Sequence, residues 1–127
     1  MSIVLIADDN LIVRRSLTSA LNKREIKTDI AECGHIALQT LQTMHEHNIR
    51  VPVAILDQHM KDPDCTVCYD GDGVVKEWKK RHPDSKTVFV CYTSDNKGRK
   101  EFNDTFVKPS MQEMISYVAD IYIRDSF

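Results

Sequence analysis

The stretch Ile3-Val-Leu-Ile-Ala-Asp-Asp9 sets five apolar residues directly before two carboxylates. A short continuous apolar run of this kind is typical of a strand that is buried on both faces of a parallel sheet. Three later runs also end on a residue suited to phosphoryl chemistry: 53–56 before Asp57, 88–92 before Thr93, and 105–107 before Lys108. Because open parallel sheets bind ligands at the carboxyl ends of their strands, we expect these side chains to converge at one edge of one sheet.

Segments with helical periodicity alternate with these runs, which is the pattern of βα units. Apolar residues recur at helical spacing over 13–21 and over 37–44, the second of these segments being opened by Gly34. A third helix is expected to begin at Gly73 and to end near His82-Pro83, and Ser110 with Glu113 forms a capping box for a last helix. With a further strand around 27–32, the sequence predicts five strands and about five helices.

Length and composition limit the architecture to one domain, residues 1–127, because 127 residues with 42% hydrophobic content can bury a single core. The formal charge of -2 provides no basic stripe, which argues against direct nucleic-acid binding. The sequence shows neither a signal segment nor a long apolar run, so a soluble cytoplasmic protein is expected, without membrane insertion. In that compartment the cysteines are expected to be reduced thiols: Cys33, Cys65, Cys68 and Cys91.

Over essentially its whole length the chain resembles the receiver domain of two-component response regulators. The resemblance rests on four motifs in the right order and spacing: Asp8-Asp9, Asp57, Thr93-Ser94 and Lys108-Pro109. It implies a doubly wound, flavodoxin-like three-layer α/β sandwich whose five parallel strands have the order 2-1-3-4-5. In that order the first and third strands are neighbours, so their three aspartates would meet at the topological switch point.

The three aspartates form the expected metal site. Carboxylates held close together repel one another and favour a hard divalent cation, and Mg²⁺ prefers one or two carboxylates together with waters and a phosphoryl oxygen. Asp9 and Asp57 are the expected direct ligands. The resemblance further implies that Asp8 acts through a bound water and that the backbone carbonyl of His59 completes the protein's contribution.

Asp57 is the expected phosphoacceptor, a nucleophile towards a phosphoryl group carried by a partner's histidine. Lys108 would place a positive charge against the phosphoryl oxygens, and the Thr93 hydroxyl would donate a hydrogen bond once the group is present. Taken singly, each aspartate is as readily a turn former or a helix cap, and only the joint pattern indicates a site. His45, next to Glu46, is interpreted as a helix-surface residue and not as a phosphodonor.

The predicted function is that of a signalling phosphoacceptor which catalyses only its own phosphorylation and dephosphorylation, not of an enzyme acting on other substrates. Its expected partners are a sensor histidine kinase or a phosphotransfer protein, and a downstream protein target whose identity the sequence does not give. The expected state is a monomer or a weak dimer. No output domain is expected after Phe127 from this sequence, and a stand-alone regulator and a receiver cut from a longer chain both stay open.

The chain departs from the receiver pattern after Asp57, where the segment that leads to Gly73 is about twice the usual length and contains Cys65-Thr-Val-Cys68. A Cys-x-x-Cys pair has three interpretations here. It is half of a zinc site to which nearby residues could add ligands, it is a redox-sensitive pair, or it belongs to an inert polar loop. The alternative function is therefore a receiver-like interaction module that responds to metal or thiol state instead of phosphorylation. The nearby candidate ligands are His59, Asp62, Asp64 and Asp70.

Two further departures lie between Thr93 and Lys108. The interval is several residues shorter than in the family, so that a full amphipathic fourth helix cannot be written on residues 94–104 and a shortened fourth helix region is expected. Thr105 stands where receivers usually carry a rotating aromatic residue, and Phe106, one position on, should face the opposite side of the sheet. The sequence thus predicts intact phosphorylation with an altered readout.

Overall fold

The computed structural model describes residues 1–60, 69–94 and 101–125. All four apolar runs form strands, and with the segment after the first helix they build one five-stranded sheet. Every neighbouring pair is parallel, and the order is β2-β1-β3-β4-β5, as the sequence predicts. The strands are β1 (Val4–Ala7), β2 (Thr28–Ala31), β3 (Val53–Leu56), β4 (Val88–Thr93) and β5 (Asp104–Val107).

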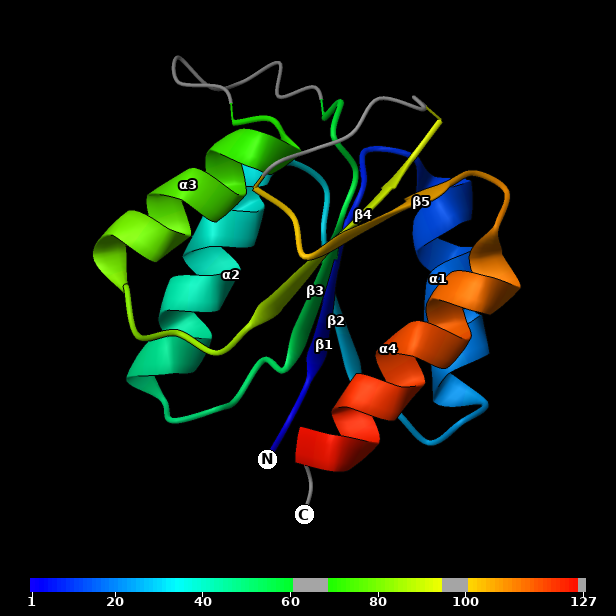
Figure 1. Ribbon diagram of the computed structural model, residues 1–127, viewed down its shortest axis with the longest axis horizontal. Helices are drawn as coiled ribbons and strands as arrows, with labels where there is room; N and C mark the ends of the chain where they lie inside the picture. The colour runs from blue at the N-terminus through cyan, green and yellow to red at the C-terminus, as the bar shows by residue number, and fades with distance from the viewer. Residues whose placement is uncertain (61–68, 95–100, 126–127) are drawn as a thin grey trace.

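Four helices cover the two faces of this sheet. Helices α2 and α3 lie on one face and helices α1 and α4 on the other, which gives three layers (Figure 1). The helices are α1 (Leu11–Asn22), α2 (Gly34–Glu46), α3 (Gly71–Arg81) and α4 (Met111–Asp125). No helix in these described ranges is both long and apolar enough to cross a bilayer.

The central strands send alternate side chains to the two faces, and each face has its own apolar cluster. In β1, Leu5 contributes to the cluster beneath α2 and α3, whereas Val4 and Ile6 contribute to the cluster beneath α1 and α4. All four residues of β1 and all four of β3 are buried, which explains why these strands read as continuous apolar runs rather than as alternating ones.

The register of the central strands brings their carboxyl ends level with one another. Ala7, the last residue of β1, pairs with Leu56, the last residue of β3. At the other side of the sheet Thr93 pairs with Val107, so that Lys108 follows β5 beside the end of β4. The residues after β1, β3 and β5 and the last residue of β4 therefore lie at one edge of the sheet.

Helix α3 begins two residues earlier than the sequence predicts. It starts at Gly71, not at Gly73, because the side chain of Asp70 accepts a hydrogen bond from the Gly73 N–H at 2.8 Å and caps the helix. A Cβ atom at Gly71 would lie 2.8 Å from the carbonyl oxygen of Asp57. Glycine at this position thus allows the helix to start directly against the chain that leaves β3.

The expectation of about five helices is wrong for the described part of the chain, which contains four. Between β4 and β5, residue 94 and residues 101–103 are not helical, and residues 95–100 lie outside the described ranges. Phe102 is only 8% exposed and packs into the cluster beneath α2 and α3. One aromatic ring therefore contributes apolar packing in the stretch that was too short for a full helix.

Candidate functional site

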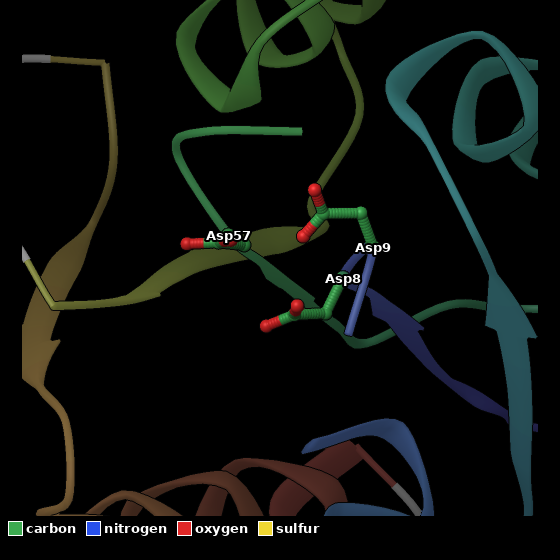
Figure 2. A group of neighbouring side chains, drawn as sticks. All are labelled: Asp8, Asp9 and Asp57. Carbon is green, nitrogen blue, oxygen red and sulfur yellow. The ribbon is translucent and has the colours of Figure 1, made fainter. Parts of the chain in front are cut away.

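Three carboxylates from two strands come together at the carboxyl edge of the sheet. Asp8 and Asp9 follow β1, Asp57 follows β3, and one ligand oxygen from each lies within 4.8 Å of the other two (Figure 2). Asp8 and Asp57 are almost entirely buried, with exposed fractions of 2% and 8%, whereas Asp9 is exposed. Both the expected juxtaposition and its cause, adjacent parallel strands of equal register, are present in the structure.

Asp8 is held from the backbone side as well as by its neighbours in the cluster. Its Oδ1 accepts a hydrogen bond from the Asn10 N–H at 2.9 Å, and its carbonyl accepts one from Arg14 Nη1 at 2.8 Å. The turn-forming interpretation of Asp8 is thus partly right, but the residue that caps α1 is Asn10, whose side chain accepts from the Ile12 and Val13 N–H groups. The capping role of Asn10 and the burial of Arg14 were not expected from the sequence.

Among the residues that the structure describes, Lys108 is the lysine whose ammonium group forms ion pairs with the aspartate cluster. Its Nζ donates to Asp8 Oδ2 at 2.9 Å and lies 3.8 Å from Asp57 Oδ1. Its backbone N–H donates to the carbonyl of Thr93 at 2.8 Å, which fixes the end of β5 against β4. Burial by itself lowers the pKa of Lys108, but the hydrogen bond to Asp8 and the charges of Asp57 and Asp8 outweigh it and leave the pKa above its ordinary value.

The pKa of Asp57 is strongly shifted by this arrangement. Burial raises its pKa to about 6 from 3.8, with Asp8 adding to the rise and Lys108 opposing it. The ammonium of Lys108 therefore does not offset the combined effect of burial and of the Asp8 charge on Asp57. Hard oxygen ligands with excess negative charge are the donor set that a divalent cation such as Mg²⁺ prefers, so the residues present fit a bound Mg²⁺.

Thr93 and His59 occupy the remaining expected positions. Thr93 ends β4 and is fully buried at the same edge of the sheet, next to Tyr92, over whose ring Lys108 Nζ lies at 5.6 Å from the centroid. His59 lies two residues after Asp57 and has an exposed side chain. The metal-binding role of its backbone carbonyl stays a prediction.

The cysteines divide into two groups. Cys33 and Cys91 are buried, with Cys91 in the cluster beneath α2 and α3. Cys65 and Cys68 lie outside the described residues, as do two of the aspartates considered as zinc ligands with them. Of the residues named for that site, Asp70 has a different role, since it caps α3.

The fifth strand agrees with the predicted departure from the receiver pattern. Phe106 packs beneath α1 and α4, where its ring centroid lies 5.5 Å from that of Tyr117. Thr105 pairs with Cys91, whose side chain belongs to the opposite face. An aromatic side chain is therefore present near this position, but on the other side of the sheet from Thr105.

One residue near the site was not singled out from the sequence. Gln58 directly follows Asp57, is 4% exposed, and contacts the start of α3 through both its backbone and its side chain. A buried glutamine next to the expected nucleophile is noticeable in the sequence, but its partners, Asp70 to Asp72, follow it by 12 to 14 residues along the chain. Only the three-dimensional structure identifies them.

No protein-family model and no curated protein matches the sequence. Among solved structures the chain is similar to the response regulator protein TrrA of Thermotoga maritima, determined in complex with Mg²⁺–BeF, with a TM-score of 0.77 at 22% identity over 95% of this chain and 99% of that one. The receiver domain of the Francisella response regulator 1452 gives 0.77 at 22% identity over 97% and 98%. A two-component response regulator from Clostridium difficile gives 0.77 at 17% over the full length of both chains. The chain therefore has the fold of response-regulator receiver domains.

Proposed function

We propose that the chain is a phosphoacceptor receiver, in which Asp57 takes a phosphoryl group from a histidine of a sensor kinase or phosphotransfer protein. The observation that carries the proposal is the convergence of Asp8, Asp9 and Asp57 within 4.8 Å beside Lys108, whose Nζ lies 3.8 Å from Asp57 Oδ1. The receiver fold supports it, and one of the similar structures holds Mg²⁺–BeF. Receiver domains are signalling modules, and the kinase and the downstream target of this chain are not identified.

In the proposed reaction a carboxylate oxygen of Asp57 forms a bond to phosphorus while the bond from phosphorus to the donor's imidazole nitrogen breaks, and the imidazole leaves with a proton. With a pKa of about 6, Asp57 is about nine-tenths ionised at pH 7, which is the nucleophilic form. Mg²⁺, held by Asp9 and Asp57 with Asp8 and the His59 carbonyl in support, would neutralise the charge that gathers on the phosphoryl oxygens.

The chain's own residues would then stabilise the product. Lys108 is positioned to exchange part of its contact with Asp8 for a contact with a phosphoryl oxygen on Asp57, since its Nζ already lies between the two carboxylates. The Thr93 hydroxyl, buried at the end of β4, would donate to a second oxygen. Such local changes bias the conformations available to β5 and thereby act on a partner.

The test is to incubate the protein with Mg²⁺ and acetyl phosphate and to follow its intact mass. We expect an adduct of one phosphoryl group, absent from Asp57→Ala and absent when the metal is chelated. Asp84→Ala is the matched control, because Asp84 is an exposed aspartate at the opposite edge of the sheet, and it should retain the adduct. An unmodified wild-type protein, or an adduct that persists in Asp57→Ala, would refute the proposal.

A further inference from the structure

Gln58 connects the chain that leaves β3 to the beginning of α3. It immediately follows Asp57, and at 4% exposed its side-chain amide is almost entirely removed from water. A buried amide needs hydrogen-bond partners, because leaving its donor or acceptor unmet costs about 1–3 kcal/mol. The side-chain amide of Gln58 bonds to Asp70 and Asp72, and its backbone carbonyl bonds to Gly71 between them.

Three hydrogen bonds make this connection. The carbonyl of Gln58 accepts from the Gly71 N–H at 3.0 Å, its Nε2 donates to Asp70 Oδ2 at 3.2 Å, and its Oε1 accepts from the Asp72 N–H at 3.0 Å. The other oxygen of Asp70 caps the helix through the Gly73 N–H. One carboxylate therefore both starts α3 and binds the residue next to the expected phosphoacceptor.

Close packing at the same place shows that the connection reaches the backbone of Asp57. A Cβ atom at Gly71 would lie 2.8 Å from the Asp57 carbonyl oxygen and 3.1 Å from the Gln58 Cα atom. The start of α3 thus lies directly against the peptide that joins these two residues. The direction in which the chain leaves Asp57 is set by where α3 begins.

This direction matters for a magnesium ion because Mg²⁺ requires near-octahedral geometry and short ligand distances. The two protein groups that flank Gln58, the Asp57 carboxylate and the His59 carbonyl, are the ones that the proposed function assigns to the metal. Residues 59–70 separate Gln58 from Gly71 along the chain. The hydrogen bonds of Gln58 join the two ends of this segment directly.

We propose that Gln58 is a positioning residue for Mg²⁺ binding, which holds the Asp57–His59 backbone in its ligating geometry through Asp70 and Asp72. The inference rests on the proposed function, since it concerns the metal of that same site. Some residues hydrogen-bond to a metal ligand without touching the metal themselves. Replacing such a residue typically lowers the affinity of the protein for the metal by about 10–100-fold. Gln58 does not contact the phosphoryl group in this proposal, so saturating metal should compensate for its loss.

The decisive variant is Gln58→Met, which keeps the length and volume of the side chain and removes both of its hydrogen bonds. We expect the dissociation constant for Mg²⁺, measured by calorimetry, to rise about tenfold. Phosphorylation by acetyl phosphate should be slow at wild-type Mg²⁺ concentrations and should recover at saturating Mg²⁺. The matched control is Gln39→Met, at an exposed position of α2, which should bind Mg²⁺ as the wild type does.

A second variant, Asp70→Asn, tests the same connection without an apolar substitution. Asparagine retains helix-capping ability, but its amide can no longer offer two oxygens, one to Gly73 and one to Gln58. We expect a smaller rise in the dissociation constant, and less than additive effects when it is combined with Gln58→Met. If Gln58→Met does not fold, the result for Asp70→Asn decides alone.

The outcomes separate this inference from the proposed function. If wild-type protein binds Mg²⁺ and is phosphorylated while both variants keep its dissociation constant within twofold, Gln58 is merely structural and the inference is overturned. A lower melting temperature in chelator with unchanged Mg²⁺ affinity leads to the same conclusion. If the wild type itself neither binds Mg²⁺ nor accepts a phosphoryl group, the proposed function fails, and the inference fails with it.

Discussion

Polar groups have different surroundings at the two edges of the sheet, the edge formed by the carboxyl ends of the strands and the edge formed by their amino ends. At the carboxyl edge, Asp8 and Asp57 are buried with Asp9 beside them, and Lys108 forms ion pairs with both buried carboxylates. At the amino edge, polar groups are matched with individual partners. The Trp78 indole N–H donates to Ser85 Oγ at 3.1 Å, and the Thr87 hydroxyl donates to the Val51 carbonyl at 2.7 Å.

The charges of the amino edge show the same matching. Arg50 pairs with Asp125 at 3.4 Å and also donates to its backbone carbonyl at 3.0 Å. Both residues remain accessible to water, where such a pair contributes little to stability. The same parallel sheet therefore has individually paired polar groups at one edge and a cluster of carboxylates at the other. The raised pKa of Asp57 arises in this cluster and is not a general consequence of the fold.

The largest expected effect comes from neutralising the carboxyl edge with Asp57→Asn. The pKa of Asp57 is about 6 in the folded protein and 3.8 as its ordinary value. The folded state therefore binds this proton more tightly, and ionisation of Asp57 lowers stability as the pH rises from about 4 to about 6. Without divalent cations, Asp57→Asn should raise the free energy of unfolding by about 3 kcal/mol at pH 7 and by almost nothing below pH 4.

Urea denaturation in chelator at the two pH values measures this difference. Asp84→Asn, an exposed aspartate at the amino edge, is the control and should change stability by at most about 0.5 kcal/mol at either pH. An equal effect of Asp57→Asn at pH 4 and pH 7 would show that the carboxyl edge is not electrostatically strained.

A smaller effect is expected from breaking one matched pair at the amino edge. Ser85→Ala removes the acceptor of the Trp78 indole N–H, and Trp78 is only 3% exposed. The unmet buried donor should cost about 1–2 kcal/mol of stability, independent of pH between 5 and 8. Thermal denaturation measures it, with Ser16→Ala on the exposed side of α1 as the control. Loss of the same stability in Ser16→Ala would mean that the hydrogen bond is not the cause.

The smallest expected effect concerns two imidazoles that contact each other at the amino edge. The ring centroids of His45 and His82 lie 4.1 Å apart with the rings tilted by 46°, and the His82 ring also contacts Trp78 at 4.2 Å. Burial first, and then the charges of His45 and Arg81, lower the pKa of His82. Because the unfolded chain binds a proton at this histidine more readily than the folded protein does, the free energy of unfolding decreases as the pH falls below about 6.5 towards the folded pKa.

In His45→Asn the pKa of His82 should move back towards its ordinary value, because one of the positive neighbours is gone. NMR titration of the His82 ring protons measures the change. His47→Asn is the control, since His47 is an exposed histidine of the same α2 terminus and bonds the Thr43 carbonyl. A pKa of His82 that is unchanged in His45→Asn would show that the two rings do not interact electrostatically.

The carboxyl edge was predictable from the sequence because each of its residues follows an apolar run. Continuous apolar runs identify buried strands, parallel pairing aligns their ends, and Asp8, Asp9, Asp57, Thr93 and Lys108 were thereby assigned to one place. The structure brings the three aspartates and Lys108 together. Their roles in binding metal and accepting a phosphoryl group remain proposals that the experiments above decide.

The contacts that support the site were not predictable, because they join residues through space and not through a local pattern. Asp70 was considered as a zinc ligand, and it is a helix cap that also binds Gln58. His45 is exposed on its helix, as expected, yet its ring contacts a histidine that follows it by 37 residues in the chain. Periodicity reveals which face of a helix is buried, but it does not reveal which side chains meet at the end of that helix.

Phe102 links two connections that are far apart in the sequence. A Cβ atom at Gly71 would lie 2.9 Å from Phe102 Cζ, closer than two unbonded carbons normally approach, so the ring rests directly on the first turn of α3. The ring thus fills the space between the chain that approaches β5 and the first turn of α3. A shift of either element towards the other would have to move this ring, so the packing of the last strand depends on that of the helix that follows Asp57.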